Sequence, residues 1–480
     1  MTVVSGAIAG TGDLMVHKIS LGATGLMVAT GNVVVDIFET TSATLVVSAY
    51  LEIQHDLIIS GGNFSLLNTA ALFLDAGATI KMGGGVFSAT TGSLQSAGSI
   101  NLIYSGLSQS SGAETSIGAI ADLTVNLSAP DQQLTLASNV TVSDTAHLAM
   151  GQLVLNGHNL TVNGLLSTTA SAAIKGDAMA GLFLDGADNI SLIFSPNSSI
   201  LDTLLLSQTN GTVTLNADLT VDSIVNLQEG MVDLNGYNLT VNGSLTTLIG
   251  ASITGNASSN LLLNGMGDAI MIFSPNGALL DTLVVSQSSG NVTLLASNLT
   301  VGGSVDLQQG ALVLNNGNLT VTGVLTTAAG ASINGSINAG LTLDGTGDVL
   351  LVFAPNGGVL DTLVVSQSNG NVSLASNLTV LSSVELQEGA LMLSGNDLTV
   401  RGTLSTAVGA ALSGSVTSGL ILDGAGDVSL VFSQNASLLD NFVVSQSNGD
   451  VTLHSDLTVG IIVNVQQGSL VLNSYDLTIN

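Results

Sequence analysis

Cysteine and tryptophan are absent from the 480-residue chain, and aromatic residues make up only 3% of it. Without Cys, the chain has no disulfide framework, no thiol nucleophile and no Cys-ligated metal site. Charged residues are also scarce, at 8% against about 25% in a typical globular domain. Because hydrophobic residues reach 45%, this composition excludes intrinsic disorder. It predicts a large core built from Val, Leu, Ile and Ala.

Basic residues are the scarcest charged class. Against 33 acidic residues there are four basic ones, for a formal net charge of −29; they are Lys18, Lys81, Lys175 and Arg401. Phosphate binding requires clustered Lys and Arg, so we expect no nucleic-acid partner. No apolar run reaches the ~20 residues of a membrane span, so we expect no membrane insertion. The first residues also lack the basic and apolar segments of a signal peptide.

A long repeat runs through most of the chain. Ser-Gln pairs return at spacings of 79, 80 and 79 residues, and a Phe and an Asp keep the same period. The pairs begin at Ser207, Ser286, Ser366 and Ser445; the other two series are Phe194, Phe273, Phe353 and Phe432, and Asp202, Asp281, Asp361 and Asp440. Repetition at a fixed period is the signature of a solenoid or a repeat array.

A shorter unit of 20 residues lies inside the long one. Asx-Leu-Thr-Val, or a close variant, begins in pairs 20 residues apart at Asn139 and Asn159, Asp218 and Asn238, Asn298 and Asn318, Asn377 and Asp397, and Asp456 and Asp476. Four units of this length would make one long repeat of 79–80 residues.

One such unit, NLTVGGSVDLQQGALVLNNG (298–317), shows the expected local structure. Its three apolar runs are rich in β-branched residues and strand-like, and the Gly-, Gln- and Asn-rich spacers are turn-like. Three strands in about 20 residues predict one coil of a parallel β-solenoid, in which each coil pairs with the next. The predicted fold is therefore all-β, a β-helix expected to be right-handed, with a four-coil superrepeat and up to ~24 coils.

The regularity of the repeat divides the chain in two. Residues 122–480 form the regular array. Residues 1–121 have the same composition but lack the regular repeat spacing, and they are predicted to be irregular solenoid coils or a cap. The run at 100–106, INLIYSG, resembles ISLIFSP at 190–196 but lies 90 residues from it instead of 80. The stretch LSQSSGAETSIGAI (107–120) is expected to be the extra loop.

Acidic turns that recur once in each long repeat are the candidate metal ligands. Calcium prefers several carboxylate and carbonyl oxygens on a turn that Gly permits. The Asx-Gly-x-x-Asp pattern offers such oxygens at Asp185, Asp188, Asn264, Asp268, Asp344, Asp348, Asp423 and Asp427. The alternative is that Asp and Gly only satisfy a tight turn. Calcium is thus the one candidate cofactor, and we expect no other.

The Asx residue before each Leu-Thr-Val also has two interpretations. Several of these positions lie in Asn-x-Thr, the N-glycosylation signal. Asp takes the same place at Asp218, Asp397 and Asp456, which a glycan site would not tolerate. A hydrogen-bonded Asx turn that stacks on its neighbour accounts for both residue types.

Catalytic constellations are not apparent in the sequence, and we expect no enzyme activity. A polysaccharide lyase needs a base and cations beside the uronate, but the four Lys and Arg are scattered. A hydrolase needs two carboxylates that face one cleft. The five histidines share no metal-ligand spacing; they are His17, His55, His147, His158 and His454.

From Asn139 onward, the coils with NLTVNG and their variants resemble the repeat-rich β-helical surface proteins of bacteria, the filamentous-haemagglutinin and autotransporter-adhesin class. The resemblance covers roughly three quarters of the chain. It implies export, display on the bacterial cell surface or outside the cell, and adhesion or matrix building.

The two ends of the chain suggest how it assembles. The sequence stops at NSYDLTIN inside a long repeat, and it begins with MTVVSG, which could pair with an LTV strand. Coil ends with unpaired backbone groups invite another chain. We therefore expect an extracellular structural protein, a β-helical rod that joins head to tail with identical copies into a surface or biofilm-matrix filament. The alternative is an adhesin stalk or phage-type fibre that presents a tip to a glycan or host surface.

Overall fold

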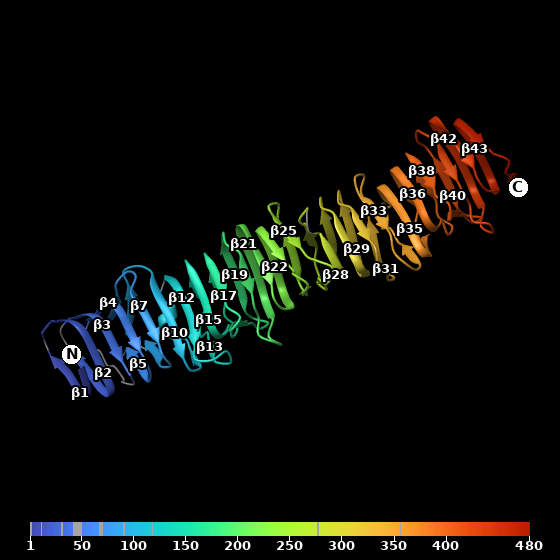
Figure 1. Ribbon diagram of the computed structural model, residues 1–480. Helices are drawn as coiled ribbons and strands as arrows, with labels where there is room; N and C mark the ends of the chain where they lie inside the picture. Colours follow the sequence, from blue (N-terminus) through green and yellow to red (C-terminus); the bar gives the residue numbers. More distant parts are fainter. Residues whose placement is uncertain are drawn as a thin grey trace. The chain divides into compact units, whose positions relative to one another are not determined.

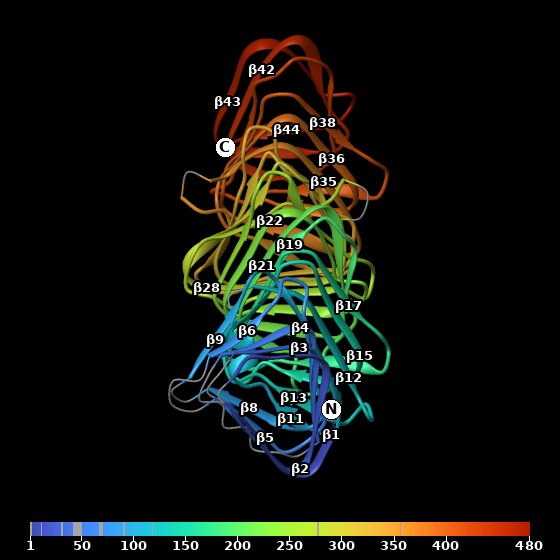
Figure 2. The same ribbon diagram turned by 90° about the vertical axis from the view of Figure 1, so that its left-hand side faces the viewer.

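The computed structural model describes residues 2–10, 12–29, 32–41, 50–66, 71–89, 92–117, 119–275, 278–355 and 357–480. Its chain forms two compact units, Met1–Asp233 and Leu234–Asn480. Both are almost entirely β-structure, and the strands of each unit follow one another in chain order (Figure 1). The turned view shows the chain winding turn upon turn within each unit (Figure 2). The predicted all-β parallel solenoid is confirmed, with about 21 turns.

The first unit contains one short 3-10 helix, η1 (Ala113–Ser116), and the strands β1 (Thr2–Gly10), β2 (Leu14–Ala29), β3 (Val33–Thr40), β4 (Tyr50–Ile59), β5 (Asn63–Leu66), β6 (Ala71–Leu74), β7 (Thr79–Met82), β8 (Val86–Ala89), β9 (Ser93–Ser96), β10 (Ile100–Gly106), β11 (Gln109–Ser110), β12 (Ile120–Leu127), β13 (Gln133–Thr135), β14 (Val140–Val142), β15 (Thr145–Val154), β16 (Leu160–Val162), β17 (Leu165–Thr168), β18 (Ala172–Lys175), β19 (Gly181–Gly186), β20 (Ile190–Leu192), β21 (Ile200–Leu215) and β22 (Leu219–Asp233).

The second unit contains the strands β23 (Asn238–Val241), β24 (Ser244–Thr247), β25 (Ala251–Thr254), β26 (Asn260–Leu263), β27 (Ala269–Met271), β28 (Leu279–Leu295), β29 (Leu299–Asn315), β30 (Leu319–Val321), β31 (Val324–Thr327), β32 (Ala331–Asn334), β33 (Gly340–Leu343), β34 (Val349–Leu351), β35 (Val359–Leu374), β36 (Leu378–Met392), β37 (Leu398–Val400), β38 (Thr403–Thr406), β39 (Ala410–Ser413), β40 (Gly419–Leu422), β41 (Val428–Leu430), β42 (Leu438–Leu453), β43 (Leu457–Val471) and β44 (Leu477–Ile479).

Each regular turn consists of three strand segments, as predicted. The long strand β29 bends around the turn and pairs in parallel with three successive strands of the next turn, β30, β31 and β32. Its side chains alternate between the interior and the surface, and Val305 and Leu307 are fully buried. Burying one such side chain is worth roughly 1.5–3 kcal/mol, so every turn adds its own layer to the core.

The long repeat does not correspond to four turns, which corrects the predicted four-coil superrepeat. In the second unit, Thr240 pairs with Leu262, which pairs with Val284, then Asp306 and finally Thr326. Four turns therefore end at Thr326. The equivalent of Thr240 in the next repeat is Thr320, which lies on the preceding strand β30.

The same offset recurs in the following repeat. When the strand pairing is followed from Thr320 through four turns, it reaches Ser405 on β38. The residue equivalent to Thr320 in the next repeat is Thr399, which lies on the preceding strand β37. With three strand segments per turn, the repeat spans three and two-thirds turns. The Asx-Leu-Thr-Val motif therefore moves to the next of the three faces in every repeat.

The described part of the irregular region 1–121 also forms parallel strands, but its turn lengths are uneven. Thr2 pairs with Ser20, whereas Leu72 pairs with Leu94, across a longer stretch of sequence. The core of this region contains aromatic side chains that pack edge to face, with ring centroids 6.1 Å apart for Phe38 and Phe64. Phe64 and Phe87 pack in the same way at 4.9 Å. Whether this region is a separate domain or a cap stays a prediction.

The stretch 107–120 is more ordered than the loop that we expected. It contains the two-residue strand β11, the helix η1 and the first residue of β12, and residue 118 lies outside the described part of the chain. Glu114, on η1, is fully buried and accepts hydrogen bonds from the Tyr104 hydroxyl (2.6 Å) and the Gly112 N–H (2.7 Å). These contacts fasten the helix to the core.

Candidate functional site

The acidic turns predicted to bind calcium are exposed, and their side chains serve as caps for the next turn. In the second unit, Asp268 Oδ1 accepts a hydrogen bond from the Asn291 N–H at 2.9 Å. The two later repeats reproduce this contact, from the Asn371 N–H to Asp348 (2.9 Å) and from the Asp450 N–H to Asp427 (3.0 Å). All eight candidates are exposed: Asp185, Asp188, Asn264, Asp268, Asp344, Asp348, Asp423 and Asp427.

The first repeat uses an asparagine at the position of these capping aspartates. There the Thr212 N–H donates to Asn189 Oδ1 at 2.9 Å, and Asn189 lies one long repeat before Asp268. Our pattern selected the adjacent Asp188 and missed Asn189, although the repeat spacing points to it. Since an uncharged Asn performs the same contact, the position requires an acceptor oxygen and not a charge.

The other member of each predicted acidic pair belongs to the backbone ladder. The N–H groups of Asn264, Asp344 and Asp423 donate to carbonyl oxygens of the preceding turn at 2.8 Å, and Asp185 lies opposite Ser207 on β21. Among the described residues, no group of three or more His, Cys, Asp or Glu side chains could hold a metal ion. Calcium binding at these turns stays a prediction.

The Asx residues before Leu-Thr-Val form hydrogen-bonded ladders between turns. Asn318 Oδ1 accepts the Gly340 N–H at 2.7 Å, and Asn298 Oδ1 accepts the Asn318 N–H at 3.2 Å. Asp397 does the same for the Gly419 N–H at 2.9 Å. Both residue types supply the required Oδ1 oxygen, which explains why Asp replaces Asn within the motif.

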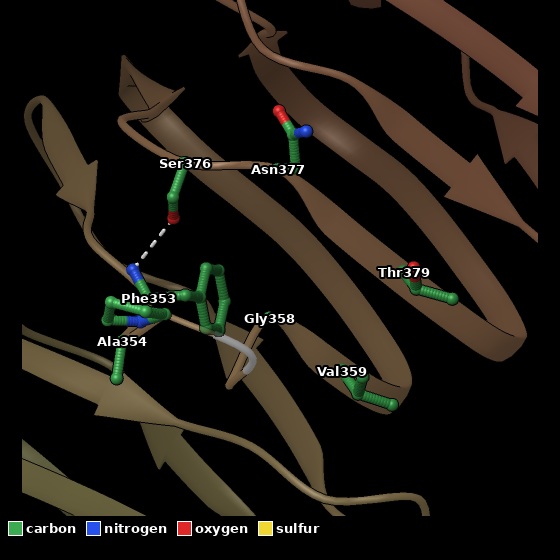
Figure 3. Close-up of a pocket in the computed structure, with 8 residues that line it drawn as sticks. Phe353, Ala354, Gly358, Val359, Ser376, Asn377 and Thr379 are labelled. Atoms are coloured by element: carbon green, nitrogen blue, oxygen red, sulfur yellow. Dashed lines mark hydrogen bonds between the residues drawn. The ribbon is translucent and has the colours of Figure 1, made fainter.

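A cleft of about 510 Å³ opens beside the Phe353 loop (Figure 3). The Phe353 ring is buried, and its N–H donates to the Ser376 hydroxyl at 2.9 Å. Asn377 and Thr379 add polar groups to the lining, and none of the lining residues that the structure describes is charged. The cleft therefore suits a small neutral molecule better than an ion.

The capping contact at this cleft returns in other repeats of the second unit. Ser297 accepts from the Phe273 N–H at 3.1 Å, and Ser455 accepts from the Phe432 N–H at 2.7 Å. The sequence showed the periodic Phe, but the serine was missed. Its signal is the Ser that directly precedes the Asx of the motif at 297, 376 and 455.

The histidines are also closer in space than their sequence spacing suggested. Asp36 on β3 lies between two imidazoles, with His17 Nδ1 on β2 at 2.6 Å from Asp36 Oδ2 and His55 Nδ1 on β4 in contact with Asp36 Oδ1. Both histidines lie one turn of this region away from Asp36, because β3 pairs with β2 on one side and with β4 on the other. The sequence did not predict this cluster, because Asp36 and the two histidines are one turn apart and do not follow metal-ligand spacing.

Comparisons with family models, with curated proteins and with solved structures find no match to this chain. Among the described residues, no helix has the length and apolar character needed to cross a membrane. The chain is a β-helical repeat protein.

Proposed function

We propose that this chain is an extracellular structural protein, and that identical copies of it join end to end into a surface or matrix filament. The observation that supports this function is the repeated turn itself: β29 pairs in parallel with β30, β31 and β32 of the next turn and adds its own layer of buried aliphatic side chains. Burying one such side chain is worth roughly 1.5–3 kcal/mol, so turns of two copies placed against each other would gain from this apolar contact. The partner we favour is a second copy, because its turns carry the same strand spacing and side-chain period.

Backbone pairing would add to this apolar contact. Neighbouring turns pair through parallel backbone ladders, as β29 does with β30, β31 and β32. An open strand edge recruits another strand, so a ladder of this kind can continue into a second copy. A contact between two different ends of identical chains does not close on itself, so it propagates as a filament.

The rotation of the motif favours a building material over a one-sided binding surface. A binding face requires the repeated side chains to return on the same face of the sheet. In the second unit the motif at Thr240, Thr320 and Thr399 lies on a different face in each repeat. The recurring Asx caps are therefore distributed around the turns, where they stabilise all three faces.

Electron microscopy and sedimentation of the full chain test this function. We expect fibres whose length grows with protein concentration, and a sedimentation coefficient that rises with it. Val324→Lys changes a 41% exposed position inside the second unit, so its fibres should form as those of the unchanged chain do. Monodisperse particles at every concentration would contradict the proposal.

The second candidate function is an adhesin stalk or fibre that presents a tip. It is favoured by the surface chemistry near the N-terminus, where the described ion pairs gather between His17 and Lys81. Binding to a host glycan or surface that Asp36→Ala abolishes, in a chain that forms no fibres, would favour this function.

A further inference from the structure

A second cleft, of about 380 Å³, lies on the outer surface of the first unit. It crosses the four neighbouring strands β7, β10, β12 and β15, which stack in this order in the solenoid (Figure 1). Thr79, Asn101, Asp122 and Thr145 follow one another across these strands, and Ile103, Thr124 and His147 form a second row beside them. The two rows bring a carboxylate, an imidazole, a carboxamide and three hydroxyls to one surface.

The key polar groups of this cleft are held in place by neighbouring turns. Asp122 Oδ1 accepts the Thr145 N–H at 3.2 Å, so the carboxylate is oriented by the next strand. His147 Nδ1 lies 3.4 Å from the Ser167 hydroxyl. Whichever tautomer His147 adopts, Nδ1 is engaged and Nε2 is left either to donate or to accept a hydrogen bond.

The mixture of groups identifies the ligand class. A sugar hydroxyl both donates and accepts, so it can pair with Asp122, with the Asn101 carboxamide and with either tautomer of His147. Ile103 lies beside Asn101 on β10, opposite Thr124 on one side and Lys81 of β7 on the other, and offers an apolar surface to the C–H face of a sugar ring. The lining contains no Lys or Arg, and the Asp122 carboxylate repels anions. A single carboxylate is too few oxygen ligands for calcium.

We propose that this cleft binds a short neutral saccharide, with Asp122 and His147 as the main hydrogen-bonding residues. Its volume lies at the lower end of the range for small-molecule sites, about 300–1,000 Å³, which suits a short oligosaccharide. The proposal does not rest on end-to-end assembly, because the cleft is formed within the first unit. Filament formation and saccharide binding can therefore succeed or fail independently.

The test is a screen of the full chain against immobilised neutral gluco-, manno- and galacto-oligosaccharides and against oligogalacturonate as an anionic probe, followed by calorimetry on the best ligand. We expect a neutral ligand whose affinity falls at least 10-fold in Asp122→Ala and in His147→Ala. Asp122→Asn keeps the acceptor for the Thr145 N–H and guards against misfolding; it should weaken binding while leaving thermal unfolding unchanged.

The control variant is Asp144→Ala, which removes an exposed carboxylate from the turn between β14 and β15, outside the cleft. It should bind as the unchanged chain does. The proposal is overturned if no neutral oligosaccharide binds, if the anionic probe binds better than the neutral ones, or if Asp144→Ala and Asp122→Ala weaken binding equally.

Discussion

Replacing one core leucine of the regular array should destabilise its own turns without unfolding the distant ones. Leu319 on β30 is fully buried and pairs with Leu299 below and Leu341 above. The strands on both sides are fixed about 4.8 Å apart by the backbone ladder, so they cannot collapse into the space that Leu319→Ala leaves. A buried Leu→Ala substitution costs about 2–5 kcal/mol, and the rigid surroundings place this one in the upper part of that range.

Hydrogen exchange measures this loss locally. Since a tenfold change corresponds to about 1.4 kcal/mol, amides of β29, β30 and β33 should exchange roughly 300-fold to more than 1,000-fold faster in Leu319→Ala. Because repeat proteins transmit stability mainly between neighbours, amides of β42 should change little. The control is Gln308→Ser, since Gln308 is exposed and its side chain donates a hydrogen bond to the nearby Asp306 (2.7 Å). Equal acceleration in both variants would refute the assignment of interior and exterior positions.

Three further predictions concern polar groups. Burial raises the pKa of the Glu114 carboxyl in the folded chain, although the hydrogen bonds from Tyr104 and the Gly112 N–H lower it. The contribution of Glu114 to stability is therefore complete below the pKa that this carboxyl has in the unfolded chain, and it is lost as the pH rises through the pKa in the folded chain. Glu114→Gln should remove this decline in urea unfolding curves measured between pH 4 and 8, and an unchanged pH profile would contradict it. Gln446 is fully buried, and both its side-chain nitrogen and its oxygen lack a hydrogen-bond partner. Gln446→Met should therefore raise the midpoint of thermal unfolding. The control is Gln287→Met, which should lower the midpoint because Gln287 is equally buried but has a polar interaction. Asp268→Asn should leave stability within about 0.5 kcal/mol because it keeps the acceptor for the Asn291 N–H, and Asp268→Ala should cost about 0.5–1.5 kcal/mol; a calcium-dependent rise of the midpoint that Asp268→Asn abolishes would support the calcium prediction instead.

The sequence was sufficient for the strands but not for their register. Alternating apolar residues separated by Gly, Gln and Asn mark three segments per turn, and LTV, SVDL and ALVL of β29 lie where the alternation places them. The number of residues in a turn was harder to predict from the sequence. The step from Thr300 to Thr320 is one turn and matches the short repeat, but the turns from Thr240 to Leu262 and from Leu262 to Val284 are both longer. Dividing the long repeat by the short one therefore overestimates the number of turns that it contains.

The candidate sites were harder to predict because their contacts join residues one turn apart. Asp268 was selected for its carboxylate, yet its described contact is with a backbone N–H on the next turn, that of Asn291. Asp36 meets His17 and His55 because each of them lies one turn from it in that region. Such pairs follow from the register and not from residue type, so they become visible only once the length of each local turn is known.

The mismatch between repeat and turn has a physical consequence for the outer surface. If one repeat filled four whole turns, every Asx cap, every Phe loop and every acidic turn would lie in line on one face of its unit. Negative charges such as Asp268, Asp348 and Asp427 would then share that face. Because the repeat stops one strand short, each of these residues lies on a different face, and the repulsion between them is reduced. The negative charges of the acidic turns are thereby spread around the second unit and do not gather on one of its faces.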